Sequence, residues 1–237
     1  MSKAADAIAK AENKMQMKKE GRVGYVIYNN PERHNAVSLD MWEAAVAILD
    51  EYRNDKDISV VVVTGAGGKA FVSGADISKF EKERSDEASV ARYGQTVEAS
   101  YNAFHTFPKP TIAMIRGYCI GGGWHLVADS DIIIAAEHAT FALPEINSGT
   151  VADAASIKLP RRIPYAVAME MLFTGRRVDA AEAKHWGLIN EVVAADQLMA
   201  RAEAIARFAL AISAPLRRTH FSALSVSQIG LKTQLLS

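Results

Sequence analysis

Short apolar runs alternate with segments of helical periodicity along the first part of the chain. Residues 23–28 (VGYVIY) are rich in β-branched and aromatic residues, and residues 59–64 (SVVVVT) form a continuous apolar run typical of a strand covered on both faces. Between them, Ser38 suits a helix N-cap, and Trp42 and Leu49 recur at helical spacing. Strand, helix and strand in this order predict a βαβ unit, so we expect an α/β fold with a parallel sheet.

The same two periodicities predict further strands and helices along the rest of the chain. Gly175 suits the C-terminal stop of one helix, and Asp179 with Glu182 forms a capping-box pattern at the start of the next. Sheet elements come first and helices accumulate late, so we predict a sheet-containing core over residues 1–195 and a helical C-terminal region over residues 196–237. The predicted strands cover residues 111–115, 132–135, 140–143 and 189–193, and the predicted helices cover residues 78–107, 124–128, 164–173, 179–187 and 196–213, with a short helix after Pro215.

The 237 residues are 49% hydrophobic and carry 27 basic and 27 acidic side chains, which is typical of a soluble globular protein. This length fits one large domain and excludes a mini-protein held by disulfides. A net charge of zero argues against general binding to nucleic acid or anionic membranes. Cys119 is the single cysteine, so neither an intrachain disulfide nor a cysteine cluster for zinc is available. The N-terminus lacks a secretory apolar core and no apolar run reaches the roughly 20 residues of a membrane span, so we expect a cytoplasmic protein.

A glycine-rich segment after the valine run matches one nucleotide-binding pattern and nearly matches another. Residues 65–70 (GAGGKA) satisfy the G-x-G-x-x-G/A dinucleotide fingerprint, but the following FVSG is predicted to be extended and then turned. The fingerprint binds pyrophosphate only where a helix opens directly after it. Lys69 is followed by Ala70 rather than by Ser or Thr, so the Walker pattern fails. We therefore predict a loop between strands, and a dinucleotide oxidoreductase is the weaker alternative.

Two other glycine-containing segments and one glutamate form a candidate site. Residues 117–123 (GYCIGGG) lie between a buried strand and a helix start. Backbone amides there either bind an oxygen that becomes negative during a reaction or belong to a plain tight turn. Gly74 permits a second such turn, and Asp76 suits the cap of the next helix. Two amides from separate loops are what a thioester oxygen needs as it gains enolate character.

Glu145 follows the apolar residues FALP and is the candidate base for such a reaction. Burial in this stretch would raise the pKa of its carboxyl toward the range in which a general base works. The alternative is a glutamate that starts a helix or forms a salt bridge.

The order of these segments resembles that of the crotonase, or enoyl-CoA hydratase/isomerase, family. The resemblance runs from residue 23 to beyond residue 193, through the segments PERHNA (31–36), AFVSGADI (70–77), KPT (109–111), GYCIGGG (117–123), FALPEI (141–146) and FTGR (173–176). It implies a crotonase-like spiral of ββα turns with a helical trimerisation region. It also implies an acyl-CoA thioester as the substrate, with coenzyme A as part of that substrate, no other cofactor and no metal. A homotrimer or a dimer of trimers is the implied assembly.

The resemblance also assigns roles to individual residues. The amides of Ala75 and Gly122 match the oxyanion hole of the family, and Glu145 matches a catalytic glutamate. The loop that holds Arg33 lines the nucleotide in relatives, although a solvated turn explains this arginine equally well. The substrate-binding positions implied are Arg33, Ala36, Ser73, Gly74, Asp76, Ile77, Ile120 and Gly121.

The chain departs from the family pattern in three places. Hydratases of the family have a second glutamate three residues after the middle glycine, where this chain has His125. This imidazole, one helical turn beyond Gly122, is either a second catalytic acid/base or a histidine packed beside Trp124. Residues 149–155 (GTVADAA) stand where hydratases often have a glycine-rich loop beside the catalytic water. Relatives usually continue past the position of Ser237 through another helical segment, so that segment is either absent or outside this sequence.

We therefore predict an acyl-CoA enzyme that stabilises a thioester enolate in an oxyanion hole. The favoured activity is that of an enoyl-CoA hydratase or dehydratase, and the segments FALPE and MLFTGRR favour the carnitinyl-CoA dehydratase-like branch. The alternatives are an enoyl-CoA isomerase that uses Glu145 alone and a non-catalytic acyl-CoA-binding scaffold. No nucleic acid or membrane partner is expected.

Overall fold

The helices and strands of the chain are known from a computed structural model, which describes residues 2–150, 152 and 155–212. The strands are β1 (Met15–Glu20), β2 (Val23–Tyr28), β3 (Val60–Gly65), β4 (Ala70–Val72), β5 (Thr111–Ile115), β6 (Tyr118–Ile120), β7 (Ile132–Ala136), β8 (Thr140–Ala142), β9 (Val178–Asp179) and β10 (Glu191–Val193). The helices are α1 (Lys3–Lys10), α2 (Leu39–Asn54), α3 (Phe80–Glu83), α4 (Glu87–His105), α5 (Gly122–Ala128), α6 (Ala155–Lys158), α7 (Tyr165–Thr174), α8 (Ala180–His185) and α9 (Leu198–Ile212). Short 3-10 turns are η1 (Pro31–Arg33), η2 (Ile77–Lys79), η3 (Pro144–Ser148) and η4 (Leu159–Arg161).

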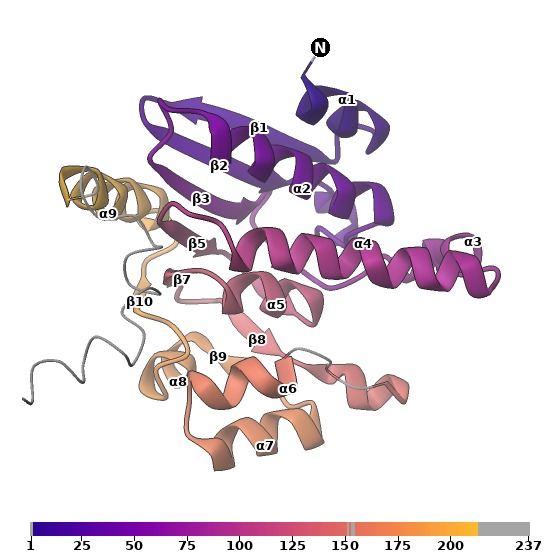
Figure 1. Cartoon of the computed structure of the whole chain (residues 1–237). Helices are drawn as coiled ribbons and strands as arrows, with labels where there is room; N and C mark the ends of the chain where they lie inside the picture. The colour runs from indigo at the N-terminus through magenta and orange to yellow at the C-terminus, as the bar shows by residue number, and fades with distance from the viewer. Residues whose placement is uncertain (1, 151, 153–154, 213–237) are drawn as a thin grey trace, which may run out of the picture.

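Successive strands alternate between two sheets. In the described residues, a six-stranded sheet has the order β1-β2-β3-β5-β7-β10, and a four-stranded sheet has the order β4-β6-β8-β9. Neighbouring strands are parallel except for β1 with β2 and β8 with β9. The pairs β3/β4, β5/β6 and β7/β8 each give one strand to each sheet, and a helix follows each pair. This is the predicted spiral of ββα turns, which runs from α2 to α7 in Figure 1.

The valine run of β3 is buried on both faces of the six-stranded sheet. Val61 and Val63 face the core cluster that includes α2, whereas Val60 and Val62 face α9. All four are at most 1% exposed, and burying one such side chain stabilises a fold by about 1.5–3 kcal/mol. Figure 1 shows α2 and α9 on opposite sides of this sheet. The predicted strand with two covered faces is therefore confirmed.

Helix α9 covers the second face of the sheet with small apolar residues. Leu198, Ala202 and Ala206 lie four residues apart and are buried against β2, β3, β5 and β7. This spacing places them on one face of the helix. The predicted helix over residues 196–213 is confirmed over Leu198–Ile212. The predicted short helix after Pro215 lies outside the described residues, and the domain division at residue 195 stays a prediction.

The predicted helix over residues 78–107 is wrong in its extent, because the structure divides this segment. Helix α3 ends at Glu83, and α4 begins at Glu87. Asp86 between them has an extended backbone, and its carboxylate accepts a hydrogen bond from the Ser89 N–H at 2.8 Å. This is N-cap geometry, which starts a new helix and does not continue the preceding one.

Helix α2 begins after Ser38, as predicted, but another element caps it. The Ser38 side chain makes no capping hydrogen bond. Instead, the Leu39 N–H donates to Oε1 of Glu83 at 3.1 Å. Helix α3 is thereby attached to the start of α2 by a contact between residues far apart in sequence.

The predicted start of α8 is confirmed in part. The Asp179 carboxylate accepts a hydrogen bond from the Glu182 N–H at 2.8 Å, as a capping residue does. The Glu182 carboxylate does not accept the hydrogen bond from the Asp179 N–H that would complete a capping box. It accepts hydrogen bonds from Arg176 at 2.7 Å and from Trp186 at 3.1 Å. Gly175, with φ of +61°, ends α7 in the left-handed conformation as predicted.

Helix α1 and strand β1 were not predicted from the sequence. Strand β1 (MQMKKE) is largely exposed and pairs with β2 at the edge of the six-stranded sheet. Charged side chains are common on such edges because they hinder pairing with other chains, but they mask the apolar alternation that marks a strand. None of the helices in the described residues is both long and apolar enough to cross a membrane.

The glycine-rich segment of residues 65–70 is a loop between strands. Strand β3 ends at Gly65, and β4 begins at Ala70, so no helix follows the fingerprint. A Cβ on Gly65 would lie 2.2 Å from the Phe71 carbonyl oxygen, so this glycine serves a close approach of two backbone segments. The loop prediction is confirmed, and the segment lacks the helix that a dinucleotide site needs.

Replacing Gly94 with alanine should stabilise the protein. Gly94 lies within α4 and is exposed, and a Cβ there would meet no atom within 4 Å. Because alanine loses less conformational freedom than glycine in a helix, we expect the free energy of unfolding to rise by about 0.5–1 kcal/mol. Thermal melting followed by circular dichroism should show a higher Tm, by roughly 1–4 °C. A lower Tm would contradict the placement of Gly94 on an open helix face.

Candidate active site

The candidate residues meet at the carboxyl ends of three neighbouring parallel strands. Strand β4 is followed by residues 73–76, β6 by Gly121 and Gly122, and β8 by Pro144 and Glu145. Because β4, β6 and β8 are parallel neighbours, the loops after them lie at one edge of the four-stranded sheet. This edge is where ligands bind in many parallel sheets.

The backbone at Gly121 joins the three loops. Gly121 has φ of +54° and ψ of −117°, and its N–H donates to the Ala142 carbonyl oxygen at 3.0 Å. A Cβ at this position would lie 3.0 Å from Oε1 of Glu145 and 3.9 Å from the Gly74 Cα. Gly121 therefore lies between the loops of Gly74 and Glu145, and a side chain there would press against the Glu145 carboxylate.

The two amides predicted for the oxyanion hole lie on either side of this junction. Gly122 is the first residue of α5, where a backbone N–H has no acceptor within the helix. The peptide groups on either side of Ala75 are hydrogen-bonded to Val37. The Val37 N–H donates to the Gly74 carbonyl oxygen at 2.9 Å, and the Val37 carbonyl oxygen accepts from the Asp76 N–H at 2.9 Å. Among the described residues, no acceptor is found for the N–H of Ala75 or of Gly122. Both residues are partly exposed, so a ligand has access to them.

Glu145 carries a partly buried carboxylate beside these glycines. It is the second residue of η3, directly after Pro144. Its Oε2 is buried, and within the described part of the chain it has no hydrogen-bond partner. Burial raises the pKa of the Glu145 carboxyl above its ordinary value. The glutamate does start a short helical turn, but the salt bridge of the alternative interpretation is not found among the described residues.

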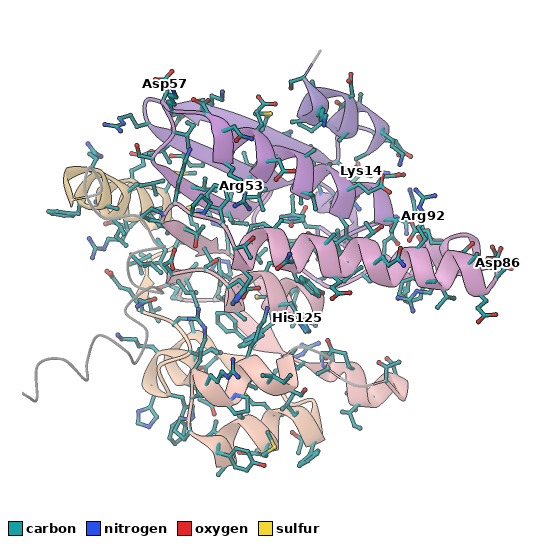
Figure 2. All side chains as sticks on the ribbon, viewed as in Figure 1. Lys14, Arg53, Asp57, Asp86, Arg92 and His125 are labelled. Atoms are coloured by element: carbon teal, nitrogen blue, oxygen red, sulfur yellow. The ribbon has the colours of Figure 1, made fainter. Side chains whose placement is uncertain are left out.

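His125 lies one helical turn beyond Gly122 and is only 3% exposed. Its ring is stacked on that of Tyr101 in α4, with centroids 4.8 Å apart and an interplanar angle of 11°. Figure 2 shows His125 inside the molecule, near α4. The imidazole thus has a packed aromatic neighbour, and a role in proton transfer stays a prediction.

The predicted substrate-binding positions surround the same strand ends. The Arg33 guanidinium donates to Ser78 Oγ at 2.6 Å and lies 3.5 Å from Oδ1 of the buried Asp76. More than half of the Arg33 side chain, 56%, is exposed. Ser73 Oγ is 3.5 Å from the Arg33 carbonyl oxygen, so these loops are in contact. The positions on or beside these loops are Ala36, Gly74, Ile120 and Gly121, together with the exposed Ile77 on η2.

Two aromatic residues near Gly122 were missed by the sequence analysis. A Cβ on Gly122 would lie 3.4 Å from Cζ2 of Trp42 and 3.5 Å from the Tyr101 hydroxyl oxygen. Tyr101 belongs to the segment of residues 78–107, for which the sequence predicted a helix but no site residue. Val97, Tyr101 and Phe104 recur at helical spacing and pack against the core, and this stripe could have identified the buried face of α4.

Comparison with known protein families identifies the family of the chain. The sequence model described as enoyl-CoA hydratase/isomerase matches residues 18–225 of the chain. The chain belongs to the enoyl-CoA hydratase/isomerase family. The family predicted from the segments of residues 31–36, 117–123 and 141–146 is therefore confirmed.

Individual members of the enoyl-CoA hydratase/isomerase family are similar over most of the chain. A carnitinyl-CoA dehydratase from Proteus mirabilis is 38% identical over 83% of this chain and 74% of its own length. A short-chain-enoyl-CoA hydratase from Clostridium acetobutylicum is 33% identical over 82% of this chain and 74% of its own length. The crystal structure of an enoyl-CoA hydratase from Bacillus anthracis superimposes with a TM-score of 0.79, at 32% identity, over 83% of this chain and 76% of that one. The predicted crotonase fold and the likeness to carnitinyl-CoA dehydratases are thereby confirmed.

In this family member, the position of Glu145 predicts an effect on stability that depends on pH. Burial raises the folded-state pKa of its carboxyl, so the ionised form destabilises the folded chain. This penalty is absent at a pH well below the ordinary value of 4.5 and grows as the pH rises through the raised pKa. Glu145→Gln should therefore raise the free energy of unfolding at neutral pH by about 0.5–1 kcal/mol, since the site is only partly buried.

Thermal melts of the wild type and of Glu145→Gln at neutral and acidic pH check this prediction. The difference in Tm should favour the variant at neutral pH and should shrink under acidic conditions. A variant that is less stable at neutral pH would show that Glu145 has a stabilising partner in solution.

Proposed function

We propose that the chain is an acyl-CoA hydratase or dehydratase. It adds water across the α,β double bond of an enoyl-CoA thioester, or removes water from the corresponding 3-hydroxyacyl-CoA. The observation that carries this proposal is the position of the Glu145 carboxylate, which lies against the backbone of Gly121 and so beside the Gly122 amide and the loop of Ala75. The names of relatives in the enoyl-CoA hydratase/isomerase family support it.

In the proposed reaction, the thioester oxygen lies between the N–H groups of Ala75 and Gly122. Electron density moves to this oxygen when a nucleophile adds to the β carbon, and the two amides stabilise the resulting enolate. Donors that are fixed before the reaction act strongly in a partly dehydrated site, and one such donor is worth about 10²–10³ in rate. The backbone of both donors is held by neighbouring hydrogen bonds of Gly74, Asp76 and Gly121.

Glu145 is the proposed proton carrier. In hydration, its carboxylate accepts a proton from water as the oxygen of that water bonds to the β carbon, and Glu145 then delivers this proton to the α carbon. Dehydration is the reverse, with loss of the α proton and departure of the β oxygen as water. The raised pKa of Glu145 brings this carboxyl closer to neutral pH, where general bases work best.

The coenzyme A part of the substrate is proposed to lie along the loops that follow β2 and β4. The exposed guanidinium of Arg33 supplies positive charge for CoA phosphates, and Asp76 and Ser78 hold this side chain in place. The remaining contacts are proposed for Ala36, Ser73, Gly74, Ile77, Ile120 and Gly121. The proposed chemistry moves only protons and water, and coenzyme A enters as part of the substrate, with no further cofactor or metal.

Isomerisation of an enoyl-CoA is the second candidate. The observation that favours it is His125, which stands at the position of the second glutamate of hydratases and is packed against Tyr101. A single carboxylate suffices to carry a proton between the α and γ carbons. A scaffold that binds acyl-CoA without turnover is the remaining alternative.

We also propose that the chain forms a homotrimer, or a dimer of such trimers, in the cytoplasm. Helix α7 and the adjoining η3 present large apolar side chains to solvent. Tyr165 and Phe173 are 70% and 73% exposed, and Ile146 is 47% exposed. Exposed apolar groups of this size commonly mark a subunit contact.

A screen of purified protein against enoyl-CoA esters tests the proposed function. The esters should differ in acyl length and should include crotonobetainyl-CoA, and loss of the conjugated thioester absorbance reports conversion by either reaction. Conversion of at least one ester to its 3-hydroxyacyl product, identified by mass spectrometry, is the expected result. A product of unchanged mass would favour isomerisation, and binding without conversion of any ester would favour the scaffold.

A further inference from the structure

Two polar side chains flank the peptide unit that supplies the proposed oxyanion amide. Oε1 of Glu145 lies 3.0 Å from the position of a Cβ on Gly121, and the Tyr101 hydroxyl oxygen lies 3.5 Å from the position of a Cβ on Gly122. Gly121 and Gly122 are consecutive, so the Glu145 carboxylate and the Tyr101 hydroxyl lie beside neighbouring residues. Neither the family resemblance nor the sequence pattern assigned a role to Tyr101.

The Tyr101 ring is held by its neighbours, which fixes the position of its hydroxyl. His125 stacks on the ring, with centroids 4.8 Å apart and planes at 11°. Trp42 approaches with its ring centroid at 5.5 Å and an interplanar angle of 79°. The Lys158 ammonium lies 5.8 Å from the centroid of the Tyr101 ring and is itself paired with Asp129 at 2.6 Å. A tyrosine with a packed ring and its hydroxyl at the border of a site is suited to hydrogen-bond a ligand.

The packing also gives His125 a role that needs no direct contact with substrate. Its ring is nearly parallel to that of Tyr101, and it is rooted in α5, the helix that begins with Gly122. The stack therefore ties the Tyr101 ring in α4 to the helix that supplies the oxyanion amide. Loss of the His125 ring would remove the stacking contact that holds the Tyr101 hydroxyl beside Gly122.

We propose that the Tyr101 hydroxyl hydrogen-bonds an oxygen on the β carbon of the acyl group, and that His125 is a positioning residue that acts through Tyr101. This inference rests on the proposed function, because it concerns the acyl end of the same substrate. It makes Tyr101 a specificity-determining residue that favours acyl groups with a β oxygen over saturated acyl groups.

Binding measured in the Glu145→Gln background tests this inference without turnover. Titration calorimetry gives the Kd values of 3-hydroxybutyryl-CoA and butyryl-CoA, which differ only in the β oxygen. Adding Tyr101→Phe keeps the stacked ring and removes the hydroxyl. We expect the preference for the hydroxylated ester to fall by about 2- to 12-fold, the range for one net hydrogen bond, with the butyryl-CoA affinity unchanged. Tyr118→Phe, which removes a hydroxyl at the start of β6, at the other end of that strand from Gly121, should leave both affinities unchanged.

A double-mutant cycle tests the role of His125. His125→Ala should reduce the same preference and should cause no further loss when Tyr101→Phe is already present. His125→Phe, which restores an aromatic face, should recover the preference if it folds, and circular dichroism reports folding. An unchanged preference in Tyr101→Phe, or additive losses in the cycle, would overturn the inference and leave the proposed function standing. Failure of the Glu145→Gln protein to bind either ester would overturn the proposed function, and this inference with it.

Discussion

Glu145→Gln should reduce the turnover of enoyl-CoA or 3-hydroxyacyl-CoA esters by about 10²–10⁴-fold, the range of a general base. Glutamine has nearly the shape of glutamate but cannot accept the proton from water. The packing against Gly121 should persist, since the contact involves the same side-chain position. Steady-state rates from the conjugated thioester absorbance measure the loss, and a bound saturated acyl-CoA shows that the site remains intact.

A surface glutamate provides the matched control for this loss. Glu98 lies on an exposed position of α4, so Glu98→Gln makes the same chemical change away from the site. Its turnover should equal that of the wild type. Turnover by Glu145→Gln within about threefold of the wild type, far short of the contribution of a general base, would remove Glu145 from the mechanism.

Gly121→Ala should impair both activity and stability. The backbone at Gly121, with φ of +54° and ψ of −117°, is a conformation that L residues adopt only under strain, at a cost of about 1–3 kcal/mol. The new Cβ would also meet Oε1 of Glu145 at 3.0 Å. Relief of this contact and of the backbone strain moves the carboxylate or the Gly122 amide by a few tenths of an ångström. Because a shift of about 1 Å at a reacting centre lowers rates by about 10²-fold, we expect a loss of up to that size.

The two consequences of Gly121→Ala are measured separately, as kcat/KM and as Tm. Gly68→Ala is the control, because Gly68 lies in the loop between β3 and β4 and a Cβ there would meet no atom within 4 Å. This control should keep the wild-type kcat/KM. Wild-type values of both kcat/KM and Tm in Gly121→Ala would show that the backbone at residue 121 does not determine the geometry of the site.

The parts of the fold that depend on local pattern were predictable from the sequence. The run of four valines in β3 has both faces buried, and its apolar continuity shows this directly. Gly175 ends α7 because a left-handed residue there favours glycine. The break between α3 and α4 was not predicted, because residues 82–87 are all polar and no change of apolar spacing marks the N-cap at Asp86.

The candidate site depended on information that local pattern does not contain. The glycines at 121 and 122 indicated a turn or an oxyanion site equally, and the family resemblance was needed to connect them with Ala75 and Glu145. The stack of Tyr101 on His125 joins α4 to α5 across 24 positions of sequence, counted from residue 101 to residue 125. Such contacts arise from tertiary packing, so no spacing rule for one helix predicts them.

Hydration of crotonyl-CoA in water enriched in heavy oxygen tests the central claim most directly. Mass spectrometry of the product distinguishes addition of water from movement of the double bond. The proposed mechanism predicts 3-hydroxybutyryl-CoA that carries the heavy oxygen, formed by the wild type and lost in Glu145→Gln. An unlabelled product with the mass of the substrate, or no product from an ester that binds, would contradict it.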